Sequence, residues 1–102
     1  MIILYLTCGT EEEAKKISTA LLEAKLIVCA KRAPVDSMYW WKGKIYDEPE
    51  VLLTMESNEQ HFDAIAALVA KLHSYEQHVL TAVPVGKTIP GVQQWLEDNL
   101  QP

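Results

Sequence analysis

The chain has 102 residues, which fits one domain over residues 1–102, because two halves would each be too small to bury a core. Its net charge is −5 and no basic cluster is longer than two residues. This balance disfavours nucleic acid and anionic membranes as partners, since both are bound largely by neutralising phosphates. No apolar run approaches the ~20 residues that a bilayer crossing needs. We therefore expect a cytoplasmic protein whose two cysteines are free thiols.

The first two predicted elements are a strand and a helix. Residues 2–8 form a short apolar run rich in β-forming residues, which predicts a buried strand. Thr10 and Glu13 have the spacing of a capping box. Apolar residues at helical intervals follow as far as about Lys25, so the predicted helix has one apolar face.

Two further strands are expected to form a hairpin. The first spans residues 27–41, with Pro34 at an edge position or a bulge. Lys42-Gly43 is the predicted turn. The second begins near Lys44, and Pro49 with its two acidic neighbours predicts a break in it before residues 51–55.

A second helix, a fourth strand and a short final helix complete the chain. Residues 57–60 have the pattern of another capping box, which predicts a helix whose last turn contains His73. His61, in the first turn of that helix, is expected to be exposed. Residues 79–83 predict a strand, and residues 92–100 predict the final helix.

This order, β-α-β-β-α-β plus a C-terminal helix, predicts an α+β fold, the ferredoxin-like two-layer sandwich. Right-handed crossovers bring the end of the first strand, the end of the second helix and the start of the fourth strand to one edge. Cys8, His73 and His78 should therefore lie close together there. Cys29 belongs to the opposite edge, so a disulfide with Cys8 is not expected.

Thiol and imidazole groups suit copper or zinc, so we predict a metal site at Cys8, His73 and His78. Tyr75 and Glu76 lie between the histidines and offer a hydroxyl and a carboxylate. The spacing matches no compact metal motif. The simpler alternative is that His73 caps its helix, His78 is solvated and Cys8 is a small buried hydrophobe.

The run Tyr39-Trp40-Trp41 alternates across a strand, so Trp40 faces away from the other two. A domain of this size can hardly bury all three rings. Exposed aromatics on a hairpin favour a partner surface, and self-association is the simplest form of it. The alternative is a hairpin that folds its rings back onto its own sheet.

Several segments along nearly the whole chain form a recognisable set. The most specific are Tyr39-x-Trp41-x-Gly43-Lys44 and His73-x-Tyr75-Glu76, and the others are Leu21-Leu22-Glu23, Val83-Pro84-Val85 and Trp95-Leu96. Together they resemble the CutA family of divalent-cation tolerance proteins. The resemblance implies a ferredoxin-like homotrimer similar in architecture to the PII signalling proteins. It also implies copper binding near clefts between subunits, with Tyr39, Trp41, Lys44, Tyr75 and Glu76 lining the cleft.

The chain departs from the family pattern at several positions. Ser74 and His78 replace two prolines, Lys31 replaces an asparagine, and Glu56 replaces a lysine. Leu6 stands where some copper-binding members carry a cysteine, and Cys8 follows two positions later. Of the family's ligands, only His73 matches in place.

The leading interpretation is a non-enzymatic homotrimer that binds a divalent metal ion of the copper type. The second is a PII-like regulatory module whose cleft binds a small metabolite or a partner protein. An enzyme is less favoured, because the sequence has no Ser-His-Asp order, no Gly-rich phosphate loop and no paired-carboxylate motif. An acylphosphatase-type site on this fold would need an arginine in the first loop, and the only arginine is Arg32. An RNA-binding protein fits the topology but not the acidic charge.

Overall fold

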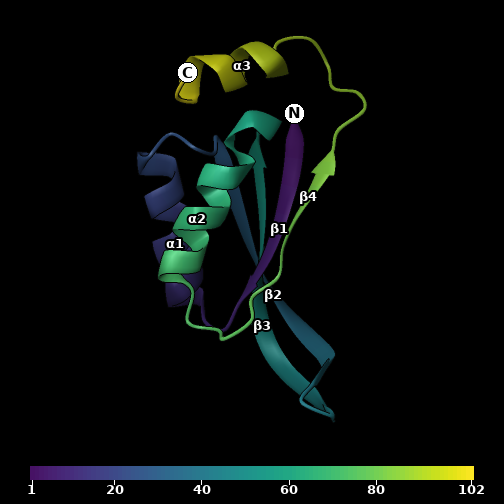
Figure 1. Cartoon of the computed structure of the whole chain (residues 1–102). Helices are drawn as coiled ribbons and strands as arrows, with labels where there is room; N and C mark the ends of the chain where they lie inside the picture. Colours follow the sequence, from purple (N-terminus) through teal and green to yellow (C-terminus); the bar gives the residue numbers. More distant parts are fainter.

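The computed structural model describes residues 1–102 and contains one four-stranded antiparallel sheet in the order β2-β3-β1-β4 (Figure 1). The elements, in chain order, are β1 (Ile2–Cys8), α1 (Glu11–Glu23), β2 (Cys29–Trp41), β3 (Lys44–Ser57), the 3₁₀ turn η1 (Glu59–His61), α2 (Phe62–Leu72), β4 (Leu80–Pro84) and α3 (Val92–Asn99). Helices α1 and α2 pack on one face of the sheet, as the ferredoxin-like prediction requires. None of the helices combines the length and apolarity of a membrane crossing.

The core lies between this helical layer and alternate residues of the two central strands. Along β1, the side chains of Ile2, Leu4, Leu6 and Cys8 are buried, as period-2 alternation requires. They pack against the apolar faces of α1 and α2. Tyr5, on the other face, is 39% exposed. Cys8, the last residue of β1, therefore lies at the end of the core where β1 leads into α1.

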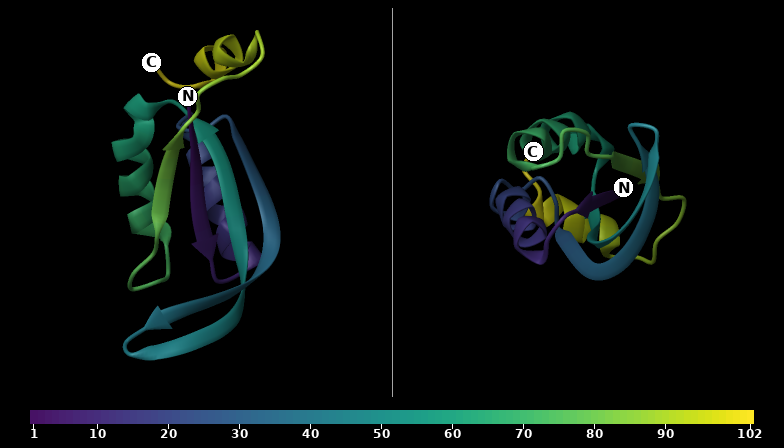
Figure 2. Two further views of the ribbon diagram at one scale, coloured as in Figure 1. Left: turned by 90° about the vertical axis from the view of Figure 1, so that its right-hand side faces the viewer. Right: turned by 90° about the horizontal axis from the view of Figure 1, so that it is seen from below.

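Strand β3 runs without the predicted break at Pro49. Residues 44–50 of β3 extend beyond β1, which pairs with β3 only from Val51 onward, and have β2 as their single neighbour. Pro49 lies outside the part of β3 that pairs with β1. Its lack of a backbone N–H therefore removes no hydrogen bond between these two strands. The result is a long β2–β3 hairpin whose far end bends away from the rest of the sheet (Figure 2).

The predicted capping box at residues 57–60 is wrong. Ser57 ends β3, is fully buried, and its hydroxyl donates to the carbonyl of Leu26 at 2.6 Å. Its side chain is therefore not free to cap a helix. The chain instead passes through η1 before α2 begins at Phe62.

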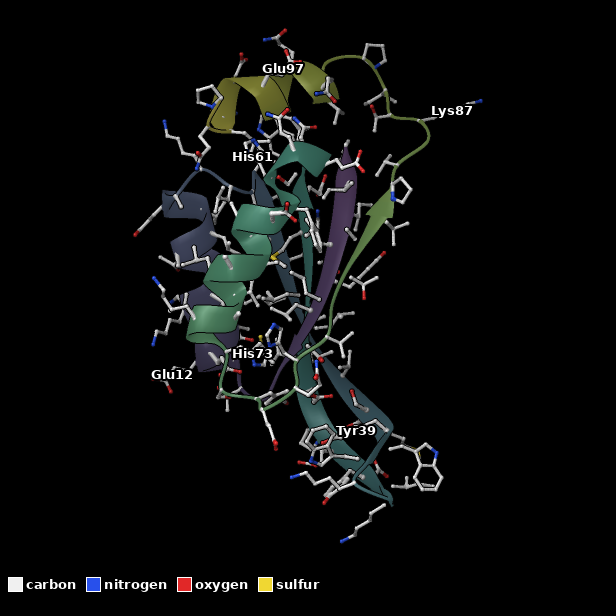
Figure 3. The ribbon with its side chains drawn as sticks, in the orientation of Figure 1. Glu12, Tyr39, His61, His73, Lys87 and Glu97 are labelled. Carbon is white, nitrogen blue, oxygen red and sulfur yellow. The ribbon has the colours of Figure 1, made fainter.

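The predicted exposure of His61 is also wrong, because this residue is only 5% exposed. It lies near the end of the molecule where α3 closes the fold, far from His73 at the other end of α2 (Figure 3). Leu96 and Leu100 are buried, and the backbone N–H of Gln101 donates to the carbonyl of Lys25. The α3 segment thus covers the end of the molecule opposite the predicted metal site.

Candidate functional site

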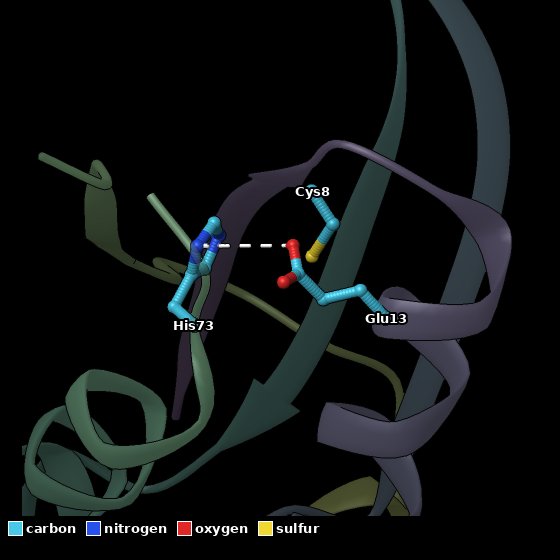
Figure 4. Close-up of side chains that lie close together, drawn as sticks. All are labelled: Cys8, Glu13 and His73. Atoms are coloured by element: carbon cyan, nitrogen blue, oxygen red, sulfur yellow. Dashed lines mark ion pairs between the residues drawn. The ribbon is translucent and has the colours of Figure 1, made fainter. Parts of the chain in front are cut away.

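Three potential metal ligands converge at the lower end of the helical layer. Cys8 ends β1, Glu13 lies in the first turn of α1, and His73 follows the last residue of α2. Their ligand atoms all lie within 4.8 Å of one another, and Figure 4 shows the three side chains facing a common point. The predicted proximity of Cys8 and His73 is confirmed, and the carboxylate of Glu13 joins them.

Glu13 is held by hydrogen bonds at both ends. Its backbone N–H donates to the hydroxyl of Thr10, as the capping-box spacing predicts. Its Oε1 accepts the N–H of Gly9 at 3.4 Å, and its Oε2 accepts the N–H of Ser74 at 2.9 Å. Burial raises the pKa of Glu13, but the hydrogen bonds from Ser74 and Gly9 outweigh it and hold the pKa below its ordinary value.

The side chain of His73 is fully buried, and both of its ring nitrogens have partners. Nδ1 accepts the backbone N–H of Tyr75 at 3.1 Å, so the ring proton lies on Nε2, which donates to the carbonyl of Thr7 at 2.8 Å. Nδ1 also lies 3.8 Å from Oε1 of Glu13, the approach marked in Figure 4. This approach becomes an ion pair only when the ring carries a second proton.

The thiol of Cys8 is completely buried. Burial raises its pKa to about 12, and the carboxylates of Glu13 and Glu50 add to the shift. The group is therefore a protonated thiol at neutral pH and a poor nucleophile. Cys29 is likewise a free cysteine, at the start of β2.

His78 stacks on His73, with ring centroids 5.0 Å apart and planes 14° from parallel. It lies outside the group formed by Cys8, Glu13 and His73. The topology therefore places all three sequence-predicted ligands in one neighbourhood, with His78 in the outer position.

A groove of about 660 Å³ separates the bent hairpin from the loop after α2. Its lining includes Tyr39, Trp41, Glu48, Glu50, Tyr75 and Glu76. Four of the five residues that were predicted to line a cleft between subunits therefore line this groove within a single chain, namely Tyr39, Trp41, Tyr75 and Glu76. The fifth, Lys44, lies instead beside Tyr46, with Nζ 5.4 Å from the ring centroid.

Two tyrosine–glutamate pairs shape this groove. The hydroxyl of Tyr75 donates to Glu50, and that of Tyr39 donates to Glu48. Burial, followed by the bond to Glu50, raises the pKa of Tyr75. The bond to Glu48 is the main cause that raises the pKa of Tyr39 to about 12. Both phenols therefore remain hydrogen-bond donors through neutral pH.

Tyr75 also contacts the loop that leads into α1. A Cβ placed on Gly9 would lie 3.2 Å from Cε1 and 3.3 Å from the hydroxyl oxygen of Tyr75. Glycine at position 9 therefore allows the tyrosine ring to approach the backbone closely. This contact joins the Cys8–Glu13–His73 cluster to the groove.

Sequence reasoning missed Glu13 and Glu50 as members of this site. The sequence pattern explained Glu13 as a helix-capping residue. Its closeness to His73 depends on a contact between distant segments, since its partner Ser74 lies 61 positions further along the chain. Glu50 is largely buried although its neighbours Glu48 and Pro49 are exposed. Strand alternation puts Glu50 on the same face as Glu48, opposite the core residues Val51 and Leu53, so the sequence carried no signal for its burial.

Two of the departures from the family pattern compensate for each other. Lys31 on β2 and Glu56 on β3 form an ion pair of 2.7 Å between Nζ and Oε1. The same lysine lies 3.5 Å from the sulfur of Cys29. The negative charge at position 56 is therefore neutralised locally, on the strand end away from the groove.

The class defined by these features is a small ferredoxin-like α+β protein with a buried thiol–carboxylate–imidazole cluster beside an aromatic groove. The chain belongs to the CutA1 divalent ion tolerance protein family, whose family model matches residues 2–99. The family and the fold predicted from the sequence are both confirmed.

Individual relatives show how evenly the likeness extends along the chain. The divalent-cation tolerance protein CutA of Thermotoga maritima is 31% identical over 100 residues, which cover 98% of this chain and 99% of that protein. Protein CutA of Homo sapiens is 33% identical over 93 residues, 90% of this chain but 52% of the human protein.

Solved structures give the same result for the fold. CutA1 from Pyrococcus horikoshii superposes with a TM-score of 0.96 at 27% identity, covering 100% of both chains. CutA1 from Shewanella sp. SIB1 gives a TM-score of 0.94 at 31% identity, covering 99% of this chain and 95% of the other.

Proposed function

We propose that this protein binds a divalent metal ion of the copper or zinc type at Cys8, Glu13 and His73, as a homotrimer and without catalysis. The observation that carries the proposal is the convergence of three different ligand types within 4.8 Å, with the side chains of Cys8 and His73 fully buried and that of Glu13 14% exposed. The family's description as a divalent ion tolerance protein agrees with it.

The chemistry of the ligand set fits such an ion. Thiolate and imidazole are the ligands that copper and zinc prefer, and a carboxylate oxygen completes a mixed set. A bound ion would stabilise the thiolate of Cys8 and would pair with the negative charge of Glu13. His78, beside His73, is the residue we propose as a further ligand, in keeping with the sequence prediction.

Titration calorimetry with Zn(II) on the reduced protein tests the proposal, because zinc has no redox chemistry of its own. We expect Cys8→Ser to weaken binding at least tenfold. Cys29→Ser is the matched control and should bind as the parent does. Equal affinities in all three proteins would exclude the cluster, and the same titration of His78→Ala decides whether His78 takes part. Competition with Cu(II) then ranks the two metals.

The proposed trimer has its own support in the hairpin. Trp40 is 71% exposed, Met38 72% and Ile45 53%, so a single chain leaves a large apolar surface at the hairpin. Strand β2 is also an edge strand along its whole length. An exposed edge offers unpaired N–H and C=O groups to another chain, and an exposed apolar patch marks a contact surface.

Analytical ultracentrifugation tests the assembly. We expect a species of three times the chain mass of 11.5 kDa. The double substitution Trp40→Ser with Met38→Ser should shift it toward the monomer. Ile89→Ser removes an equally exposed side chain, 77% accessible, from a loop remote from the hairpin, and it should leave the trimer intact. A parent protein that sediments at 11.5 kDa would exclude the trimer.

The groove supports the second candidate, a regulatory module that binds a small metabolite. Its volume of about 660 Å³ lies within the usual range of ligand sites, roughly 300–1,000 Å³. Glu48, Glu50 and Glu76 line it and no basic residue does, so a cationic metabolite would suit it better than a phosphorylated one.

A thermal-shift screen separates the candidates, since a ligand selective for the folded state raises stability. Stabilisation by metals alone favours the first candidate, and stabilisation by an organic cation favours the second.

A cytoplasmic location is part of the same proposal. Both cysteines are free, which agrees with a reducing compartment. Fractionation of cells followed by detection of the protein tests the location directly.

A further inference from the structure

Tyr75 connects the ligand cluster to the groove through both its backbone and its side chain. Its N–H donates to Nδ1 of His73, and its hydroxyl donates to Glu50. Its ring lies against Gly9 and forms part of the groove wall. A change at His73 can therefore reach the groove through this one residue.

The ring nitrogens of His73 leave only one way to bind a metal ion. Nε2 carries the proton and is directed at the carbonyl of Thr7, whereas Nδ1 lies on the side of Glu13. Nδ1 has a single lone pair, which now accepts the N–H of Tyr75. A metal ion and this N–H cannot share that lone pair.

We infer that a divalent cation bound at Cys8, Glu13 and His73 displaces the backbone N–H of Tyr75 from His73 and so releases the Tyr75 side chain from the groove wall. The inference rests on the proposed metal-binding function and assigns that site a switching role. Metal-free and metal-bound forms then differ in the shape of the groove.

The neighbouring bonds confine the change to Tyr75. Ser74 donates to Oε2 of Glu13, while Oε1 is the oxygen that faces His73, so Glu13 can bind an ion through Oε1 and keep the bond to Ser74. Residues 73–79 belong to no helix or strand. Tyr75 can therefore move without breaking a sheet or helix hydrogen bond.

Amide hydrogen exchange, followed by NMR on the full chain with and without Zn(II), tests this inference. We expect exchange at Tyr75 to become about fivefold faster or more with zinc, as the loss of one hydrogen bond implies. Exchange at Ser74 should stay within twofold. Zinc binding with unchanged exchange at Tyr75 would overturn the inference and leave the proposed function standing. Absence of zinc binding would overturn both.

Reciprocity supplies a second test that needs no structural readout. If zinc binding breaks the contact between Tyr75 and Glu50, removing that contact beforehand should tighten zinc binding, because the coupling acts equally in both directions. We expect Tyr75→Phe, which keeps the ring, to bind Zn(II) about fivefold more tightly. Tyr39→Phe removes the equivalent bond to Glu48 and is the control, with unchanged affinity. Equal affinities for Tyr75→Phe and the parent would contradict the coupling.

Discussion

Glu13 accepts the backbone N–H of Ser74 at 2.9 Å, so the first turn of α1 holds the loop that follows α2. The same carboxylate accepts the N–H of Gly9, the residue before the N-cap Thr10. One side chain thus ties together three segments that meet at the candidate site. The cluster is organised around this carboxylate, and its stability should depend on the carboxylate's charge.

Acidification should weaken the fold through Glu13. Because its pKa is lower in the folded protein than the ordinary value of 4.5, its stabilisation is fully present above that value and is lost as the pH falls through the folded pKa. Urea unfolding of the metal-free protein from pH 7 to about pH 3 should show a loss of about 1 kcal/mol that Glu13→Gln lacks. Glu12→Gln, on the exposed side of the same turn, should retain the parent's pH dependence. An identical pH profile for Glu13→Gln would contradict this role.

Cys8 should resist alkylation. With a pKa of about 12, only about one thiol in ten thousand is ionised at pH 8, and the group is fully buried. Iodoacetamide should therefore label Cys29 in the native protein and Cys8 only after unfolding. Peptide mass spectrometry with and without urea measures both. Comparable labelling of Cys8 in the native protein would show that the site opens readily.

The features predicted correctly from the sequence are those set by neighbours along the chain or by topology. Thr10 caps α1 within three residues, and Lys42-Gly43 forms the hairpin turn with positive φ at both positions, 49° and 78°. Crossover handedness was enough to bring Cys8 and His73 together. These inferences need no knowledge of side-chain packing.

The failures involve partners that are distant in sequence. Ser57 has the pattern of a helix cap, but its hydroxyl donates instead to the carbonyl of Leu26, which lies 31 positions earlier in the chain. Glu13 joins His73 only after α1 and α2 pack side by side. Local patterns rank the options for such polar groups, and tertiary contacts decide between them.

Gly9→Ala should destabilise the site by steric conflict with Tyr75. The added Cβ would lie 3.2 Å from the ring, which must shift and weaken its hydrogen bond to Glu50. We expect a loss of ~1–2 kcal/mol in the free energy of unfolding, the usual cost of overpacking. Gly86→Ala meets nothing within 4 Å and should change stability by less than ~0.5 kcal/mol. Chemical denaturation measures both, and equal stabilities would show that Tyr75 moves freely.

Two buried serines should respond in opposite ways to the same substitution. The hydroxyl of Ser57 bonds across the fold to Leu26, so Ser57→Ala leaves a buried carbonyl without its partner and should cost ~1–2 kcal/mol. The hydroxyl of Ser18 donates to the carbonyl of Ala14 within α1, a carbonyl that the helix ladder also uses. Because alanine has the higher helix propensity, Ser18→Ala should be neutral or slightly stabilising. Urea denaturation of both variants checks the contrast. A larger loss for Ser18→Ala than for Ser57→Ala would mean that the contact between β3 and the α1–β2 loop contributes little to the fold.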